Sequence, residues 1–137
     1  MSTVTDMLNT YPAGLGAVDR TALGECVEEC QRCAQACTAC ADACLAEPDD
    51  ELPMLRKCVR TCADCADVCD ATARVLSRHT GYDVNISRTL ARACATTTVS
   101  CAEECQRHAG RHGHCRVCAE ACRRCADACQ RLLANLS

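Results

Sequence analysis

The most regular pattern along the chain is a set of stripes in which cysteine recurs every three or four positions. In the segment CVEECQRCAQACTACADAC, residues 26–44, six cysteines are separated by steps of 4, 3, 4, 3 and 4. Alternating steps of three and four place residues on one face of an α-helix. The residues between the cysteines are mostly Ala, Gln, Glu and Asp, which suit the solvent-facing side of a helix. The segment therefore predicts a helix that carries a continuous stripe of thiols.

Three later segments repeat this spacing, so the sequence predicts four helices. Residues 58–69 have cysteine steps of 4, 3 and 4, and residues 115–129 have steps of 3, 4, 3 and 4. Residues 94–105 have steps of 7 and 4, with Thr98 at the omitted position. The predicted helices span residues 19–46, 51–79, 86–109 and 114–134.

Helix-ending and helix-capping residues separate the stripes. The first gap contains Pro48 and the candidate N-caps Asp49 and Asp50; the second contains Gly81 and the candidate N-caps Asp83 and Asn85; the third contains Gly110 and Gly113.

Four helices with one narrow stripe each and short connections predict an all-α fold, an antiparallel up-down four-helix bundle with a cysteine-lined core. We assign residues 17–137 to this metal-binding bundle domain and residues 1–16 to an N-terminal extension. The extension is expected to form a short helix packed outside the bundle or at a subunit contact. Small residues beside the stripes would let the helices approach closely: Ala34, Ala41, Ala66, Ala102, Ala119 and Ala126.

The composition leaves cysteine to fill much of the interior. The 137 residues fit one domain, and they include 23 Ala and 18 Cys but only 21 residues of Leu, Ile, Val and Phe together. A net charge of -3 is too small to favour disorder. Free cysteine behaves as a small buried hydrophobe, yet thiols in place of leucines leave an underpacked core. We therefore expect something other than protein atoms to occupy the interior.

The cellular compartment decides whether these cysteines are reduced. The N-terminal segment lacks the basic region and apolar run of a signal peptide, and no stretch is apolar enough to span a membrane. We therefore expect a cytoplasmic protein with reduced thiols. Acidic and basic residues are interleaved along the helices, so neither nucleic acid nor a membrane is an expected partner.

Pairs of thiols on one helix suit a metal ion better than a disulfide. Side chains four positions apart lie roughly 5–6 Å from each other, so their sulfurs can bind one ion between them. Their parallel directions do not give the torsion angle of a disulfide. The chain has eight such pairs, at positions 26/30, 33/37, 40/44, 58/62, 65/69, 101/105, 118/122 and 125/129.

The ligand set predicts a soft metal ion. Thiolates select Cu(I), Zn(II) or iron–sulfur clusters, but zinc and iron–sulfur sites commonly take their cysteines from loops. A buried zinc ion with four thiolates keeps two negative charges, whereas one Cu(I) per bridging thiolate is close to neutral. Charge matching therefore predicts roughly 18 Cu(I) ions inside the bundle.

The two ends of the predicted bundle carry different residues. One end is expected to be closed by apolar packing of Leu23, Leu76, Leu90, Leu132 and Leu136. At the other end, His108 and His112 continue a cysteine stripe, and Cys115, His114 and Met54 lie nearby. Imidazole and thioether bind soft ions more weakly than thiolate does, which suits uptake and inward transfer. We predict that this end is the metal entrance, with Met54 and His114 as further uptake residues.

Cysteine stripes of the C-x3-C type on four helices, with histidines in the last loop, resemble the bacterial four-helix-bundle copper storage proteins, in particular their cytosolic branch. The resemblance covers about residues 17–136. It implies a homotetramer whose lumen holds many Cu(I) ions as thiolate clusters, for protection against excess copper or for slow supply. A copper chaperone or a small-molecule copper carrier is an expected partner.

The resemblance also implies a set of metal ligands in this chain. Its ligand positions match Cys26, Cys30, Cys33, Cys37, Cys40, Cys44, Cys58, Cys62, Cys65, Cys69, Cys94, Cys101, Cys105, Cys115, Cys118, Cys122, Cys125 and Cys129. His108 and His112 match the histidines near the open end. The stripe with Thr98 has fewer thiols than the other three.

Two other functions stay open at this point. A zinc store or buffer would use the same thiols for four or five ions. A thiol oxidoreductase would need one exposed cysteine of low pKa at a helix N-terminus, and Cys115 is the only candidate by position. Eighteen periodic thiols exceed what such an enzyme needs, so we expect no catalytic residue and no enzymatic activity.

Overall fold

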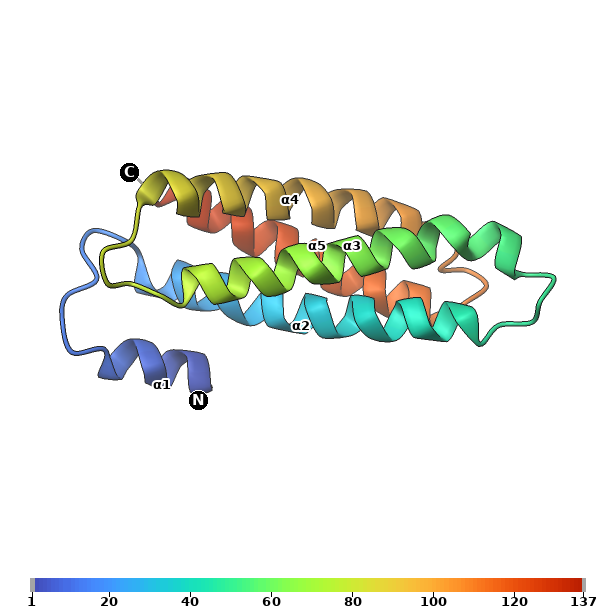
Figure 1. Cartoon of the computed structure of the whole chain (residues 1–137), viewed down its shortest axis with the longest axis horizontal. Coiled ribbons are helices and arrows are strands. Elements are labelled where there is room, and N and C mark those ends of the chain that lie inside the picture. Colours follow the sequence, from blue (N-terminus) through green and yellow to red (C-terminus); the bar gives the residue numbers. More distant parts are fainter. Residues whose placement is uncertain (1, 137) are drawn as a thin grey trace.

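The computed structural model describes residues 2–136, which form five α-helices and no β-strand. The helices are α1 (Thr3–Thr10), α2 (Arg20–Leu45), α3 (Leu52–Leu76), α4 (Val84–Gln106) and α5 (Gly113–Ala134). Figure 1 shows α2 to α5 side by side along the long axis of the molecule, with α1 outside them. The predicted all-helical class is confirmed. None of the helices in this part of the chain has the length and apolar character needed to cross a membrane.

The four long helices enclose one interior. Contacts join α2 to α3, α3 to α4, α4 to α5 and α5 to α2, so each long helix has two neighbours. The α2–α3 and α4–α5 connections lie at one end of the molecule, here called the open end after the predicted metal entrance, and the α3–α4 connection lies at the other, the closed end (Figure 1). All eighteen cysteines lie on these helices and are buried. The four predicted stripes therefore face a shared interior.

The helix boundaries agree with the predicted ones to within three residues. Asp83 caps α4 as predicted, because its carboxylate accepts a hydrogen bond of 2.8 Å from the N–H two residues later. The prediction that Asp49 or Asp50 caps α3 is wrong. The N–H of Glu51 donates to the carbonyl of Pro48 at 2.8 Å, which places both aspartates in the middle of a turn and leaves Glu51 at the N-cap.

The N-terminal helix α1 packs against α2. Leu8 is buried beside Gly24, where an added β-carbon would lie only 3.2 Å from the Leu8 side chain. Glycine inside a helix is destabilising, so Gly24 is best explained by this close approach. The hydroxyl of Ser2, which caps α1, also donates a hydrogen bond to the carboxylate of Glu28 in α2.

Apolar packing closes the end at which α3 connects to α4. Three leucines are buried there, Leu23, Leu76 and Leu132, and Leu136 is partly buried against them. Leu15, from the segment between α1 and α2, is buried at the same end. Leu90 is only half-buried and is not part of the buried core, so the predicted closure forms without it.

Candidate metal centre

The eighteen cysteines form a column of thiols through the interior. All of them are free, and neighbouring Sγ atoms lie close together, for example 3.6 Å apart in Cys33 and Cys122 and 4.0 Å apart in Cys40 and Cys115. These distances are far longer than the disulfide bond length of about 2.05 Å. They are short enough for one ion to contact two sulfurs at about 2.3 Å, the length of a zinc–sulfur bond. The column is therefore spaced for metal ions shared between helices.

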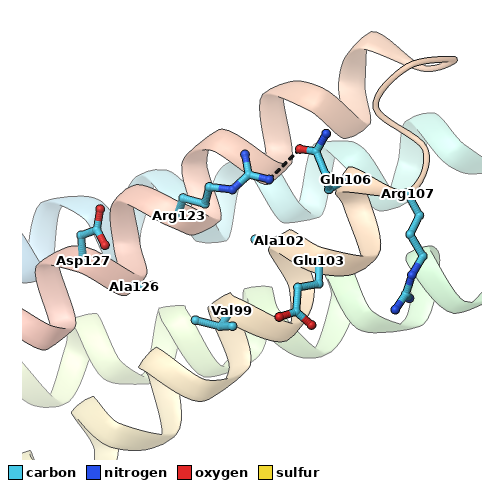
Figure 2. Close-up of a pocket in the computed structure, with 8 residues that line it drawn as sticks. All are labelled: Val99, Ala102, Glu103, Gln106, Arg107, Arg123, Ala126 and Asp127. Atoms are coloured by element: carbon cyan, nitrogen blue, oxygen red, sulfur yellow. Dashed lines mark hydrogen bonds between the residues drawn. The ribbon is translucent and has the colours of Figure 1, made fainter.

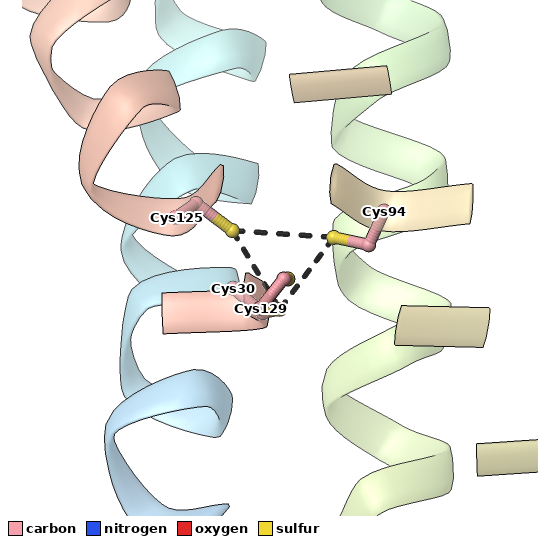
Figure 3. Close-up of side chains that lie close together, drawn as sticks. All are labelled: Cys30, Cys94, Cys125 and Cys129. Atoms are coloured by element: carbon pink, nitrogen blue, oxygen red, sulfur yellow. Dashed lines mark hydrogen bonds between the residues drawn. The ribbon is translucent and has the colours of Figure 1, made fainter. Parts of the chain in front are cut away.

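Figure 3 shows one group of sulfurs toward the closed end. Cys30 projects from α2, Cys94 from α4, and Cys125 and Cys129 from α5. The Sγ atom of Cys30 lies 3.7 Å from those of Cys94 and Cys125, which are 4.0 Å from each other. All four sulfurs lie within 4.8 Å of one another. Ions placed among them would take ligands from three helices.

Further groups of this kind follow along the column and share members. From the middle toward the open end they are Cys33–Cys37–Cys65–Cys122, Cys37–Cys101–Cys118–Cys122, Cys40–Cys58–Cys62–Cys105 and Cys40–Cys44–His114–Cys115. Cys37, Cys40 and Cys122 each belong to two of these groups, so their sulfurs can bridge ions in adjacent groups. The arrangement suits a chain of linked clusters better than a set of isolated sites.

Thr98 fills the gap in the α4 stripe. Its side chain is fully buried, and its hydroxyl donates to the carbonyl oxygen of Cys94 at 2.8 Å. This bond satisfies the hydroxyl within the helix. The column therefore lacks one thiol at this level without exposing an unsatisfied polar group.

At the open end, His114 is the histidine that contacts the thiols. Its Nδ1 lies 3.5 Å from the Sγ atoms of both Cys40 and Cys115. Its Nε2 lies 2.8 Å from Oε2 of Glu47. The sequence placed His114 only among the uptake residues, but the structure places it directly beside the outermost thiols.

His108 and His112, which were expected to continue the stripe, contact carboxylates instead. Nε2 of His108 lies 2.9 Å from Oε2 of Glu104, and Nδ1 of His112 lies 3.0 Å from Oε2 of Glu47. The helical periodicity stops before both histidines, because α4 ends at Gln106. Their role as metal ligands stays a prediction.

Met54 lies on the first turn of α3 with an exposed side chain. Its predicted part in uptake also stays a prediction.

Acidic residues at the open end are the feature that cysteine spacing could not indicate. Glu104 is buried and pairs with His108 and Arg107. A hydrogen bond from His114, together with the nearby His112, lowers the pKa of the Glu47 carboxyl, which is therefore ionised at neutral pH. No periodic signal marks these glutamates, because their partners lie beyond the end of α4 or at the start of α5.

Burial keeps the outermost thiols protonated. It raises the pKa of Cys44 to about 11 and raises the pKa of Cys115 as well. A thiol must lose its proton to bind a metal ion, so metal binding here displaces protons.

A large surface groove of about 650 Å³ lies between α4 and α5, away from the thiols (Figure 2). Val99 is exposed in it, and Arg123 of α5 donates a hydrogen bond of 2.6 Å to Gln106 of α4 across it. Neither cysteine nor histidine lines this groove, so it is not the metal centre.

Comparisons with known proteins identify the family. A model of the copper storage protein family, Csp, matches residues 19–134. A structure of the copper storage protein Ccsp from Streptomyces lividans, loaded with 10 copper equivalents, is 66% identical, covers 98% of this chain and 100% of its own, and has a TM-score of 0.95. The comparison with curated proteins gave no match.

Two further structures of the Streptomyces lividans protein show the same similarity. One, described as a cytosolic copper storage protein with five coppers, is 65% identical, covers 85% of this chain and 96% of its own, and has a TM-score of 0.83. The other, a variant with one histidine replaced by alanine, is 65% identical, covers 89% of this chain and 100% of its own, and has a TM-score of 0.86. With a family match over residues 19–134 and a buried thiol column at its centre, the chain belongs to the copper storage protein family.

Proposed function

We propose that this protein stores Cu(I) in the cytoplasm as thiolate clusters inside an antiparallel up-down four-helix bundle formed by α2 to α5. The observation that carries the proposal is the column of eighteen free, buried thiols, in which neighbouring sulfurs lie as close as 3.6 Å. The alternation of the helix connections between the two ends supports the antiparallel arrangement (Figure 1). A relative described as cytosolic, 65% identical, supports the compartment. Storage protects against excess copper or holds it for later use.

We infer that the eighteen cysteines and His114 are the copper ligands. Each cysteine side chain faces the interior, and His114 belongs to the group formed with Cys40, Cys44 and Cys115. We also propose that His108 and His112 bind metal at the open end and that Met54 is an uptake residue there. At the closed end, leucines pack together, and the small pocket among them is lined by His79 but by no cysteine.

Copper capacity tests the proposal. Anaerobic titration of the reduced protein with Cu(I), against a competing chelator, is expected to saturate at about 18 ions per chain, because one Cu(I) per thiolate leaves the interior nearly neutral. The same titration with Zn(II) is expected to stop at about four or five ions and to bind less tightly. Saturation by copper at four or five ions, with zinc preferred, would show that the protein is a zinc buffer instead.

Copper loading is expected to release about one proton for each thiol that is protonated at pH 7. Burial raises the pKa of the Cys44 and Cys115 thiols, which are therefore protonated at this pH, and Cu(I) binds only the thiolate. Each displaced proton makes binding about tenfold weaker for every unit by which the pH falls below the thiol pKa. Proton release is measured with a pH indicator in weakly buffered solution, and affinity by chelator competition at pH 6, 7 and 8. An affinity that does not change with pH would mean that the thiols are already ionised.

A thiol oxidoreductase is the less favoured function. The only candidate nucleophile, Cys115, is fully buried, and burial raises its pKa. Both properties oppose the exposed thiolate that such an enzyme needs. We therefore propose that the protein has no enzymatic activity and that all of its thiols serve storage.

Assembly and partners follow from the family resemblance. We propose a homotetramer, for which the exposed Val99 in the groove between α4 and α5 offers one apolar contact. We also propose that a copper chaperone or a small-molecule copper carrier exchanges copper at the open end. Residues 17–137 are proposed as the copper-binding domain, with residues 1–16 as an extension whose helix α1 covers part of α2.

A further inference from the structure

One carboxylate oxygen at the open end faces two histidines. Oε2 of Glu47 lies 2.8 Å from Nε2 of His114 and 3.0 Å from Nδ1 of His112. The two imidazole rings are stacked, with their centroids 5.5 Å apart. Glu47 therefore joins the end of α2 to the start of α5.

The contact with Glu47 determines which nitrogen of His114 can bind metal. An ionised carboxylate only accepts hydrogen bonds, so the Nε2 that faces it must carry the proton. In the neutral imidazole the lone pair is then on Nδ1, the atom that lies 3.5 Å from the sulfurs of Cys40 and Cys115. A histidine that binds metal through one nitrogen commonly donates its other N–H to a carboxylate, which fixes both the tautomer and the ring orientation.

Helix stability does not explain Glu47. It lies just past the C-terminus of α2, where its N–H bonds to the carbonyl of Cys44 at 3.3 Å. The C-terminal end of a helix is the negative end of its dipole, so a carboxylate there is unfavourable. The partners that compensate for this position are the two histidines, and these lie more than sixty residues further along the chain.

We propose that Glu47 is a positioning residue for copper uptake: it holds His114 with Nε2 protonated and Nδ1 directed at the sulfurs of Cys40 and Cys115. An ion arriving at the open end then meets two sulfurs and one nitrogen that are already in place. This role rests on the proposed function, because it assigns a task to a residue at the copper entrance.

Glu51 provides a matched control. It lies at the same end and has the same charge, but its Oε1 accepts a hydrogen bond of 2.6 Å from Arg111, and its other oxygen has no hydrogen-bond partner. Glu51→Gln removes one negative charge from the open end without touching a histidine. Any effect of Glu47→Gln beyond that of Glu51→Gln therefore reflects the contact with the imidazoles and not the loss of charge.

The first experiment needs no variant. In the metal-free, reduced protein, long-range ¹H–¹⁵N NMR of the imidazoles at pH 8 is expected to show the His114 proton on Nε2. On addition of Cu(I) from a chelator buffer, the Nδ1 resonance should shift while the Nε2 proton stays in place. A proton on Nδ1 in the metal-free protein, or a shift at Nε2 caused by copper, would overturn the proposal.

The second experiment measures the energetic effect at the same site. In Glu47→Gln, the free Cu(I) concentration at which the His114 signal is half shifted is expected to rise about 10–100-fold, the usual range for loss of such a partner. Glu51→Gln should stay within about threefold of the unmodified protein. In a His114→Ala background, monitored through chelator competition, Glu47→Gln should lose most of its effect. Equal effects of the two glutamine variants would overturn the proposal.

Total copper capacity separates this inference from the proposed function. Glu47→Gln removes no thiol, so its capacity should equal that of the unmodified protein. A low capacity in the unmodified protein contradicts storage, whatever the His114 tautomer. A high capacity with an unaffected His114 site in Glu47→Gln contradicts only the role of Glu47.

Discussion

Filling the thiol column with Cu(I) is expected to raise the midpoint of thermal unfolding by at least about 20 °C. An ion that binds only the folded chain, at 100 times its dissociation constant, adds about 2.7 kcal/mol to the free energy of unfolding. Each kcal/mol raises the midpoint of a chain of this size by roughly 4 °C. Two such ions already raise the midpoint by about 20 °C, and the eighteen thiols of the column can bind many more ions. Thiols of the unfolded chain also bind copper, so the shift stays well below the sum of the contributions of all bound ions.

Circular dichroism at 222 nm, recorded anaerobically during heating, measures this shift. The metal-free and fully loaded proteins are compared with a half-loaded sample, which should melt between them or in two steps. Oxidised protein must be excluded by a thiol count before each scan. Identical midpoints with and without copper would mean that the ions do not bind within the folded interior.

Replacing the thiols at the middle of the column is expected to lower the copper capacity and slow its filling. The variant combines four alanine substitutions, at Cys33, Cys37, Cys65 and Cys122. Its capacity should fall from about 18 to about 14 ions per chain. The thiols toward the closed end should also fill slowly, because the variant lacks the bridging sulfurs that lie between them and the open end. Alanine favours the helix, so the fold should persist with a looser core.

A second variant controls for the number of thiols removed. It replaces the four cysteines of the group toward the closed end in Figure 3, Cys30, Cys94, Cys125 and Cys129, by alanine. Its capacity should fall by the same four ions, but the remaining sites should fill at the normal rate. Stopped-flow absorbance of the copper–thiolate bands compares the two variants. Equal rates in both would contradict uptake through the open end alone.

Cysteine spacing predicted most of the fold. A step of three or four is a local property, so each stripe identifies its helix without knowledge of the others. The cap at Asp83 was also predictable, because an N-cap contacts the backbone only two or three residues away. The error at Asp49 and Asp50 arose because an aspartate suits a turn as well as a cap, and the turn closed by Pro48 and Glu51 includes both.

The open end was less predictable because its contacts are not local. Extending the α4 stripe to His108 and His112 assumed that the helix continued to residue 109, but it ends at Gln106. His114 approaches Cys40 and Glu47 across 74 and 67 positions of sequence. No periodicity within one helix can show that such residues meet.

The leucines that fill the closed end leave the proposed entrance at the open end as the single route for copper. Copper that settles deepest, toward Leu132, can leave only through positions that later arrivals occupy. The molecule would then release its cargo in the reverse of the order in which it was received. The oldest copper would be retained longest, and the most recent would exchange most readily with the cell.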